Sequence, residues 1–320
     1  MSNPLQHNNL VRHRCLVLGG RGFIGSHLVD ELLRQGHFVL CFDRPHIQPL
    51  SNPHLNNPNF ELFEGDFASE KDASAALDGC DICFHLVSTT LPQSSNGDPV
   101  FDIESNVVST VRLLGHAVTS GVKKVIFVSS GGTVYGPPKQ VPIPETHPTD
   151  PVSSYGITKL TIEKYLHLFH TLHGLEYSIL RLANPFGERQ RVMASQGAVA
   201  VFLSKVLRGD TVEIWGDGSV VRDYIYISDV VDALIATASR ETEEHVFNIG
   251  SGRGHSLNEL LAGIEQVTGK EAHRRYLPGR LFDVPTSVLS IERAKQHLNW
   301  SPKVTFEAGL QRFSDWLVQN

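Results

Sequence analysis

Short apolar runs alternate with longer amphipathic segments through the first 180 residues of the chain. Near-continuous apolar strands separated by helices are typical of a parallel sheet that is covered on both faces. We therefore predict an α/β fold built on a Rossmann-like doubly wound parallel sheet. The predicted strands are RCLVLGG, FVLCFD, FELFEGD, ICFHLV, KVIFVSS and YSILRLAN.

The alternating pattern weakens after Asn184, where a loop rich in Gly, Arg and Gln precedes the helix-like AVAVFLSKVLRG. We predict a smaller C-terminal substrate-binding lobe over 184–223 and 251–320. The main domain covers 14–183 together with about 224–250, where HVFNIGSG returns a strand to the main sheet. No linker or internal repeat separates the two parts, so they should interleave. Residues 1–13 are predicted to be a loose tail.

Composition and charge narrow the class of protein. Hydrophobic residues make up 41% and charged residues 19% of the 320, which is typical of a globular protein. The net charge of −6 gives no electrostatic reason to bind nucleic acid or an anionic membrane. The chain has no run of 18 apolar residues, and its polar start lacks the apolar core of a signal peptide. We expect a cytoplasmic protein with no membrane or nucleic-acid partner.

Neither the cysteines nor the histidines indicate a metal site. Cys80 and Cys83 match C-x-x-C, but zinc needs two further ligands, and a redox motif would begin a helix rather than enter a strand. His167, His170 and His173 are three residues apart, and successive steps of three drift around a helix. We therefore predict no metal.

A glycine-rich turn follows the first strand and precedes a helical pattern, in VLGGRGFIGSHLVDELL. Glycines there let main-chain N–H groups approach a pyrophosphate at a helix N-terminus, where the helix dipole favours negative charge. This context favours dinucleotide binding over a turn that serves packing alone. The turn residues predicted to hold the dinucleotide are Gly19, Gly22, Phe23, Ile24 and Gly25.

The second strand ends at Asp43, which lies 18 residues after Gly25. A carboxylate at that position accepts hydrogen bonds from both ribose hydroxyls of an adenosine and repels a 2′-phosphate. Arg44 complicates the choice, because an arginine can accommodate the 2′-phosphate or stack on adenine. We predict NAD rather than NADP, with Asp43 and Arg44 in its site.

A tyrosine and a lysine one helical turn apart follow the fifth strand. In PVSSYGITKLTIEKYL, Ser153 or Ser154 can cap a helix on which Tyr155 and Lys159 share a face. A tyrosine with its usual pKa of about 10 is a poor base near neutrality. The lysine ammonium, with a positive nicotinamide nearby, favours the phenolate and lowers that pKa. Such a pair can remove the proton of an alcohol.

With these motifs the chain resembles the extended short-chain dehydrogenase/reductases that act on nucleotide sugars, most closely the UDP-glucose 4-epimerase-like members. The resemblance runs from about Cys15 to Trp316. It implies NAD as the cofactor, a UDP- or dTDP-sugar as the substrate, and a homodimer. Further motifs that carry it, in the family's order, are EGDF, HLVSTT, ESNVVST and LRLANPFGERQ.

The resemblance implies further cofactor contacts. Asp66 would bind the adenine amino group, with Phe67 beside it, and Asn106 would brace the central helix. Pro185 and Phe186 would lie by the nicotinamide. The remaining residues of the implied cofactor site are Leu86, Val87 and Ser88 after the fourth strand, Ser129 at the end of the fifth, and Tyr155 and Lys159.

The resemblance also implies a substrate site. Asn184 would lie near the substrate pyrophosphate. Arg222 and Arg280 would converge on the diphosphate, since each guanidinium offers a fork that matches phosphate oxygens. Asp283 would contact the nucleotide ribose, and Thr90 is a further expected substrate residue.

One catalytic group of the family has no direct counterpart. A Ser or Thr that hydrogen-bonds the reacting hydroxyl usually sits four residues before the tyrosine of VYG, and here that residue is Gly131. Thr133 and Ser130 are the candidates for its role. Side-chain directions alternate along a strand, so Thr133 should share a face with Gly131, where the missing side chain leaves room for its hydroxyl. A water molecule in the gap is the third alternative.

Gly132 and Thr133 exclude two kinds of relative. Dehydratases of this fold carry Asp–Glu at these positions, and decarboxylases carry Glu at the second. The resemblance therefore implies an NAD-dependent nucleotide-sugar 4-epimerase of the UDP-hexose type, with Tyr155, Lys159, and Thr133 or Ser130 as catalytic residues. An NAD(P)-dependent 4-keto-sugar reductase or dehydrogenase would use the same residues. A cofactor-binding protein without catalysis is the alternative from another class.

Overall fold

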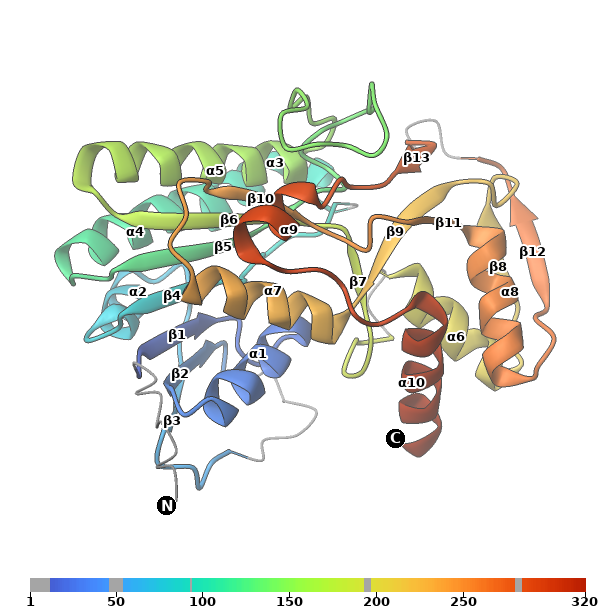
Figure 1. The fold of residues 1–320 in the computed structure, drawn as a ribbon, viewed down its shortest axis with the longest axis horizontal. Helices are drawn as coiled ribbons and strands as arrows, with labels where there is room; N and C mark the ends of the chain where they lie inside the picture. Colours follow the sequence, from blue (N-terminus) through green and yellow to red (C-terminus); the bar gives the residue numbers. More distant parts are fainter. Residues whose placement is uncertain (1–11, 46–53, 93, 193–196, 280–283) are drawn as a thin grey trace, which may run out of the picture.

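A seven-stranded parallel sheet forms the centre of the main domain (Figure 1). The structure is a computed structural model that describes residues 12–45, 54–92, 94–192, 197–279 and 284–320. The strand order is β10-β6-β5-β4-β1-β2-β3, so all six predicted strands and the returning HVFNIGSG strand are confirmed. The strands are β1 (Arg14–Leu18), β2 (Phe38–Asp43), β3 (Phe60–Glu64), β4 (Ile82–His85), β5 (Lys124–Ser130), β6 (Glu176–Leu182) and β10 (Val246–Ile249).

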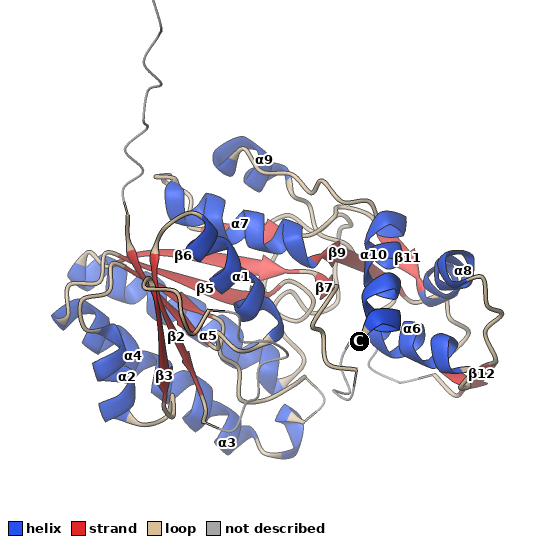
Figure 2. Cartoon of the chain, turned by 90° about the horizontal axis from the view of Figure 1, so that it is seen from below, coloured by secondary structure: helices blue, strands red, loops and turns tan. Residues whose placement is uncertain are grey.

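Helices cover both faces of this sheet, as Figure 2 shows. Alternate residues of β1 point to opposite faces. Leu16 packs in the core beneath α2 (Glu70–Leu77), α4 (Ser109–Thr119) and α5 (Ser154–His173). Val17 packs in the other core, beneath α1 (Phe23–Arg34) and α7 (Ile227–Ser239). Both faces are therefore apolar, which explains the near-continuous hydrophobic runs in the sequence.

A smaller C-terminal lobe joins the main sheet through β7 (Asn184–Phe186), which begins two residues after β6 ends. Here β9 (Val221–Tyr226) pairs with β7, β11 (Gly254–Ser256) and β13 (Thr286–Ser287), while β8 (Val212–Trp215) pairs with β12 (Arg274–Leu277). Its helices are α6 (Ala198–Arg208), α8 (Leu257–Thr268) and α10 (Phe306–Gln319), and α9 (Glu292–Leu298) lies against β10 and α7. The predicted doubly wound sheet with a smaller lobe is confirmed.

Two irregular segments lie near the carboxyl ends of the central strands. The connection from β4 to α4 contains α3 (Pro99–Asp102), which continues into a π-helical segment, Ile103–Val108. The connection from β5 to α5 runs over residues 131–153. Ligands of open parallel sheets bind at this edge, so these segments are placed to shape a site.

Candidate active site

The glycine turn between β1 and α1 is closely packed. Gly19 has φ +84°, and the N–H groups of Gly19 and Gly20 both donate to the carbonyl oxygen of Phe42. A Cβ on Gly25 would lie 2.1 Å from the Gly19 carbonyl oxygen, so no larger residue fits there. Gly22 is the N-cap of α1 and offers no side-chain cap, which leaves the first N–H groups of the helix free for an anion.

Two further predicted segments border this turn. Asp43 ends β2, and its carboxylate oxygens accept the main-chain N–H groups of Arg21 and Arg44, each at 2.9 Å. Burial raises the pKa of this carboxyl group. A Cβ on Gly19 would lie 3.5 Å from a methyl group of Val87, so the loop after β4 adjoins the turn. The structure therefore brings the glycine turn, Asp43 and the Leu86–Ser88 loop together.

Tyr155 and Lys159 lie on the first turns of α5. Ser153 is the N-cap, and its hydroxyl accepts the N–H of Gly156 at 3.2 Å. The Lys159 ammonium donates to the Val128 carbonyl at 3.0 Å and lies 5.6 Å from the centroid of the Tyr155 ring. The predicted proximity of the two side chains is confirmed.

Burial dominates the titration of both groups. It raises the pKa of Tyr155 to about 12, while a hydrogen bond with the Ser88 side chain acts in the opposite direction. It lowers the pKa of Lys159 to about 8, against the fields of Asp102 and Glu163, which raise it. The protein alone thus raises the Tyr155 pKa, because burial outweighs the Ser88 hydrogen bond, and the lowering expected beside a positive nicotinamide stays a prediction. Ser88 was expected to hold the cofactor, and its contact with Tyr155 was not foreseen.

The structure gives a reason for glycine at position 131 that differs from the one expected. A Cβ on Gly131 would lie 2.5 Å from a methyl carbon of Leu289, so this leucine fills the space beside the glycine. β5 ends at Ser130, and the next residues turn, with the N–H groups of Thr133 and Val134 directed to the Ser130 carbonyl. The alternation expected of a strand therefore does not apply, and the missing side chain makes room for Leu289 rather than for Thr133.

Thr133 still offers an unused hydroxyl. Among the described residues, its Oγ1 is buried and has no hydrogen-bond partner. Its carbonyl oxygen packs against Gly156 in the first turn of α5, at 2.8 Å from the place of a Cβ on that glycine. A buried polar atom without a partner is costly, so this hydroxyl suits a ligand.

A hollow of about 260 Å³ lies in the smaller lobe. The N-terminus of α6 lines it, and within the described ranges no side-chain hydrogen bond caps that end of the helix at Gly197. Arg222 reaches the carbonyl oxygen of Val284 at 2.7 Å, and Asn184 donates to the carbonyl oxygen of Asp223 at 2.9 Å. A helix N-terminus and an arginine together favour an anion. The remaining lining residues are Pro185, Ala198, Val199, Trp215, Val220, Tyr224 and Leu257.

Comparisons with known proteins identify the family. A model of the NAD dependent epimerase/dehydratase family matches residues 15–250. The UDP-glucose 4-epimerase of Mycolicibacterium smegmatis is 38% identical over 303 residues, which cover 93% of this chain and 96% of that protein.

The chain belongs to the NAD-dependent epimerase/dehydratase family. Two solved structures agree. The UDP-glucose 4-epimerase of Thermotoga maritima with UDP-glucose has a TM-score of 0.89 at 38% identity and covers 96% of this chain and 99% of that one. The corresponding enzyme of Thermus thermophilus in complex with NAD has a TM-score of 0.87 at 32% identity, with 95% and 99% covered.

The protein is therefore an NAD-dependent epimerase of the extended short-chain dehydrogenase/reductase type, as predicted. Its residues fit the cofactor: Gly25 leaves no space for a side chain in the turn, α1 has an uncapped N-terminus, and Asp43 ends β2 beside it. When bound, NAD supplies a hydride acceptor that can also return the hydride.

Several residues expected to line the cofactor site of this epimerase have side chains that are buried in the protein core. The Ser129 hydroxyl is buried and donates to Glu163 at 2.6 Å, so only its main chain could meet a ligand. Phe186 packs in the core against Tyr226 and Phe306 rather than toward the main-domain site. Phe67 is also buried, with its ring 5.0 Å from that of His85.

The remaining predicted residues are placed as follows. Asn106 braces the loop after β4, since its side-chain amide oxygen accepts the Thr89 N–H at 3.0 Å. Thr90 is buried, and its hydroxyl donates to Asp102 at 2.5 Å, so that hydroxyl is already engaged within the protein. Asp66 is exposed beyond β3. Arg280 and Asp283 lie outside the described residues.

Trp215 and Tyr224 also line the hollow of the smaller lobe, and neither was predicted from the sequence. Trp215 is 41% exposed although it lines the hollow of the smaller lobe. Tyr224 is buried, and its hydroxyl has no hydrogen-bond partner in the described part of the chain. Trp215 lies on β8 and Tyr224 on β9, which belong to different sheets, so only the hollow that both share with Arg222 brings them together.

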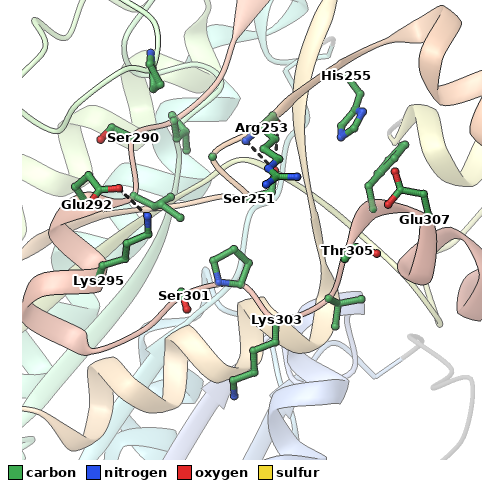
Figure 3. A pocket seen from close by; sticks show the side chains of 17 residues that line it. Ser251, Arg253, His255, Ser290, Glu292, Lys295, Ser301, Lys303, Thr305 and Glu307 are labelled. Atoms are coloured by element: carbon green, nitrogen blue, oxygen red, sulfur yellow. Dashed lines mark hydrogen bonds and ion pairs between the residues drawn. The ribbon is translucent and has the colours of Figure 1, made fainter.

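A second hollow, of about 590 Å³, is shown in Figure 3. It lies between the β10–β11 turn, α9 and the segment that leads to α10, and none of the predicted site residues lines it. Its lysines are paired, Lys295 with Glu292 at 2.7 Å and Lys303 with Asp232 at 2.6 Å. We therefore place the active site at the smaller hollow and the sheet edge rather than in this larger hollow.

The described residues contain neither a metal-binding cluster nor a membrane-spanning helix. No group of three or more His, Cys, Asp or Glu side chains is arranged to hold a metal ion. None of the helices in these ranges combines the length and apolar character that a membrane span requires.

Proposed function

We propose that this epimerase inverts C4 of a UDP-hexose by transient oxidation and re-reduction. The observation that carries the proposal is the placement of Tyr155 and Lys159 beside the Ser88 loop and the glycine turn, with no acidic side chain at positions 132 and 133. Dehydration would need an acid and a base at those two positions. Simple transfer of a hydride and a proton needs only the tyrosine and a polarising neighbour.

Tyr155 is the general base and acid of this proposal. It takes the proton of the C4 hydroxyl during oxidation and returns a proton during reduction. Lys159 holds the cofactor ribose and, as an ammonium, supports the charged phenolate. Thr133 orients the C4 hydroxyl, because its own hydroxyl is buried and unused among the described residues, and Ser130 is the second candidate.

The hollow of the smaller lobe supports binding of the nucleotide part. The uncapped N-terminus of α6 and Arg222 suit a diphosphate, and Asn184 lies at the same hollow. Trp215 offers an exposed aromatic face for a base. Arg280 and Asp283 remain expected contributors. The UDP-glucose in the Thermotoga maritima structure supports uridine as the base, and a dTDP-sugar is the alternative nucleotide.

A homodimer is part of the proposal. Exposed apolar side chains on α5 support it, namely Ile157, Leu168 and Leu172, which are 51%, 43% and 63% exposed. The last two follow Ile157 by eleven and fifteen residues, which is about 20° and 60° round the helix, so all three share one face. A second copy of this face would remove the stripe from water.

The test is incubation with UDP-glucose, UDP-N-acetylglucosamine, UDP-glucuronate and dTDP-glucose without added cofactor, followed by NMR of the products. We expect inversion at C4 of at least one UDP-sugar, and the purified protein should retain NAD. Tyr155→Phe should lower turnover by about 10²–10⁴-fold with unchanged NAD content, whereas Tyr165→Phe on the same helix should not. Reduction of a 4-keto sugar at the expense of NADH, without inversion, would contradict the proposal.

A further inference from the structure

Asp102 is a buried carboxylate that the proposed mechanism does not use. It ends α3 and is 0% exposed. It lies between the loop after β4, which carries Ser88, and the first turn of α5, which carries Tyr155. A charged side chain is rarely buried unless it is paired or hydrogen-bonded.

Four neutral donors satisfy this carboxylate. From the loop side, the Thr90 hydroxyl donates to Oδ1 at 2.5 Å and the Asn106 amide at 3.0 Å. From α5, the Ser154 hydroxyl donates to Oδ2 at 2.7 Å, and the Thr158 hydroxyl is shared between Oδ2 at 3.3 Å and the Tyr155 carbonyl oxygen at 3.0 Å. No cation pairs with Asp102 in the described structure, so its negative charge acts on the groups around it.

The segment before Asp102 holds the same helix turn. The main-chain N–H of Tyr155 donates to the Ser95 hydroxyl at 3.0 Å, and that of Ser154 donates to the side-chain amide oxygen of Asn96 at 2.8 Å. Two of the otherwise free N–H groups at the start of α5 are thus satisfied from this segment. The segment that positions Tyr155 is therefore the one that leads into α3 and Asp102.

We propose that Asp102 is a positioning residue of the active site. Its carboxylate ties the loop after β4 to the first turn of α5, and its negative charge sets the proton balance between Tyr155 and Lys159. The proposal rests on the proposed function for its catalytic meaning, while the structural and electrostatic link can be tested without turnover.

The charged and titratable groups around Asp102 agree with this role. Its field raises the pKa of both Tyr155 and Lys159, so it favours the phenol and the ammonium. Glu163, one turn further along α5, acts on Lys159 in the same direction. His85 is held neutral by burial, with a pKa of about 3, and adds no charge. The pair should therefore release a proton from Tyr155 only when further positive charge is close to it.

Asp102→Asn removes the charge and keeps the shape. We expect both limbs of the pH profile of kcat to move to lower pH by about one unit, because both groups lose a proton more easily. Asp98→Asn is the matched control, since Asp98 is the exposed N-cap of the same helix and asparagine also caps well. Ser154→Ala keeps the charge and removes one donor, so it should lower kcat without moving the limbs. An unmoved profile in Asp102→Asn would overturn the proposal.

A second measurement is independent of turnover. The ultraviolet difference between the NAD-bound protein and its Tyr155→Phe variant, followed with pH, reports the ionisation of Tyr155 alone. The same difference in the Asp102→Asn background should have its midpoint about one pH unit lower. An unchanged midpoint in a folded variant would overturn the proposal even if epimerisation is found. If no sugar is inverted, the proposed function fails, and this titration still decides the role of Asp102.

Discussion

Tyr155 and Lys159 show how burial governs the chemistry of single residues here. Burial disfavours charge, so it raises the pKa of the phenol to about 12 and lowers that of the ammonium to about 8. Near neutrality the protein alone therefore holds a phenol beside a largely protonated lysine. In the proposed mechanism a positive charge added by the bound cofactor favours the phenolate, which would link proton removal to the oxidised form of NAD.

The Lys159 shift predicts a stability that rises with pH. The pKa is about 8 in the folded protein against a usual 10.5, so the unfolded chain binds more protons in this range. Below pH 8 the full cost of the buried ammonium is present, and it is relieved as the pH approaches 10.5. Urea denaturation of the NAD-free protein measures this effect. Between pH 8 and 10.5 the free energy of unfolding of the wild type should rise by about 3 kcal/mol relative to that of Lys159→Met. A constant difference between the two proteins would refute the shift.

Gly131 and Leu289 predict a coupled pair of substitutions. Gly131→Ser should destabilise by about 1–3 kcal/mol, because its Cβ would meet the Leu289 methyl carbon. In a Leu289→Ala background the same serine should cost less, with only the Arg181 carbonyl oxygen, at 3.2 Å, still close to its Cβ, and a double-mutant cycle in urea measures this coupling. Gly132→Ser is the control, since a Cβ there meets nothing nearer than 4.0 Å. Additive effects of Gly131→Ser and Leu289→Ala would rule out the contact.

At the scale of elements, α5 is joined to β5 and β6 by a buried ionic network. Glu163 and Arg181 form an ion pair at 2.6 Å, with side chains 3% and 6% exposed. Ser129 at the end of β5 donates to Glu163, and Arg181 donates to the Tyr135 hydroxyl at 2.9 Å. The network therefore fixes α5 relative to the loop that carries Thr133.

Arg181→Met should destabilise the protein by about 3–5 kcal/mol, because it leaves the buried Glu163 without its cation. Arg208→Met is the comparison, since Arg208 pairs with Asp210 at the surface with both side chains more than half exposed. That substitution should cost less than about 1 kcal/mol. Urea denaturation measures the free energy of unfolding of both variants. Equal losses in the two would show that the buried ion pair stabilises the protein no more than the surface pair does.

Elements with a strong local signal were predictable from the sequence. β1, the glycine turn and the Tyr155 helix each carry their own pattern of apolar, glycine and capping residues. The contacts of Gly131 with Leu289 and of Ser88 with Tyr155 join residues distant along the chain, so no local pattern reveals them. The strand alternation assumed for Thr133 failed because β5 ends at Ser130, and strand ends depend on tertiary hydrogen bonds.

At the scale of the whole molecule, the connection from β6 to β7 brings the two halves of the site together. β6 ends at Leu182, which pairs with Ser130 of β5, and Asn184 begins the strand that enters the smaller lobe. The sheet edge thus carries Tyr155 and the cofactor turn, while the smaller lobe carries the hollow with Arg222. This arrangement suits a substrate with an anionic nucleotide part and a reactive sugar part.

The most direct test uses a UDP-hexose that carries deuterium at C4. If one hydride leaves C4 and returns to the same carbon within the site, the inverted product should keep its deuterium at C4 and no added NADH should be consumed. NMR of the product measures both the configuration and the label. Loss of the deuterium, or inversion that depends on added NADH, would contradict oxidation and re-reduction at C4 by Tyr155 and NAD.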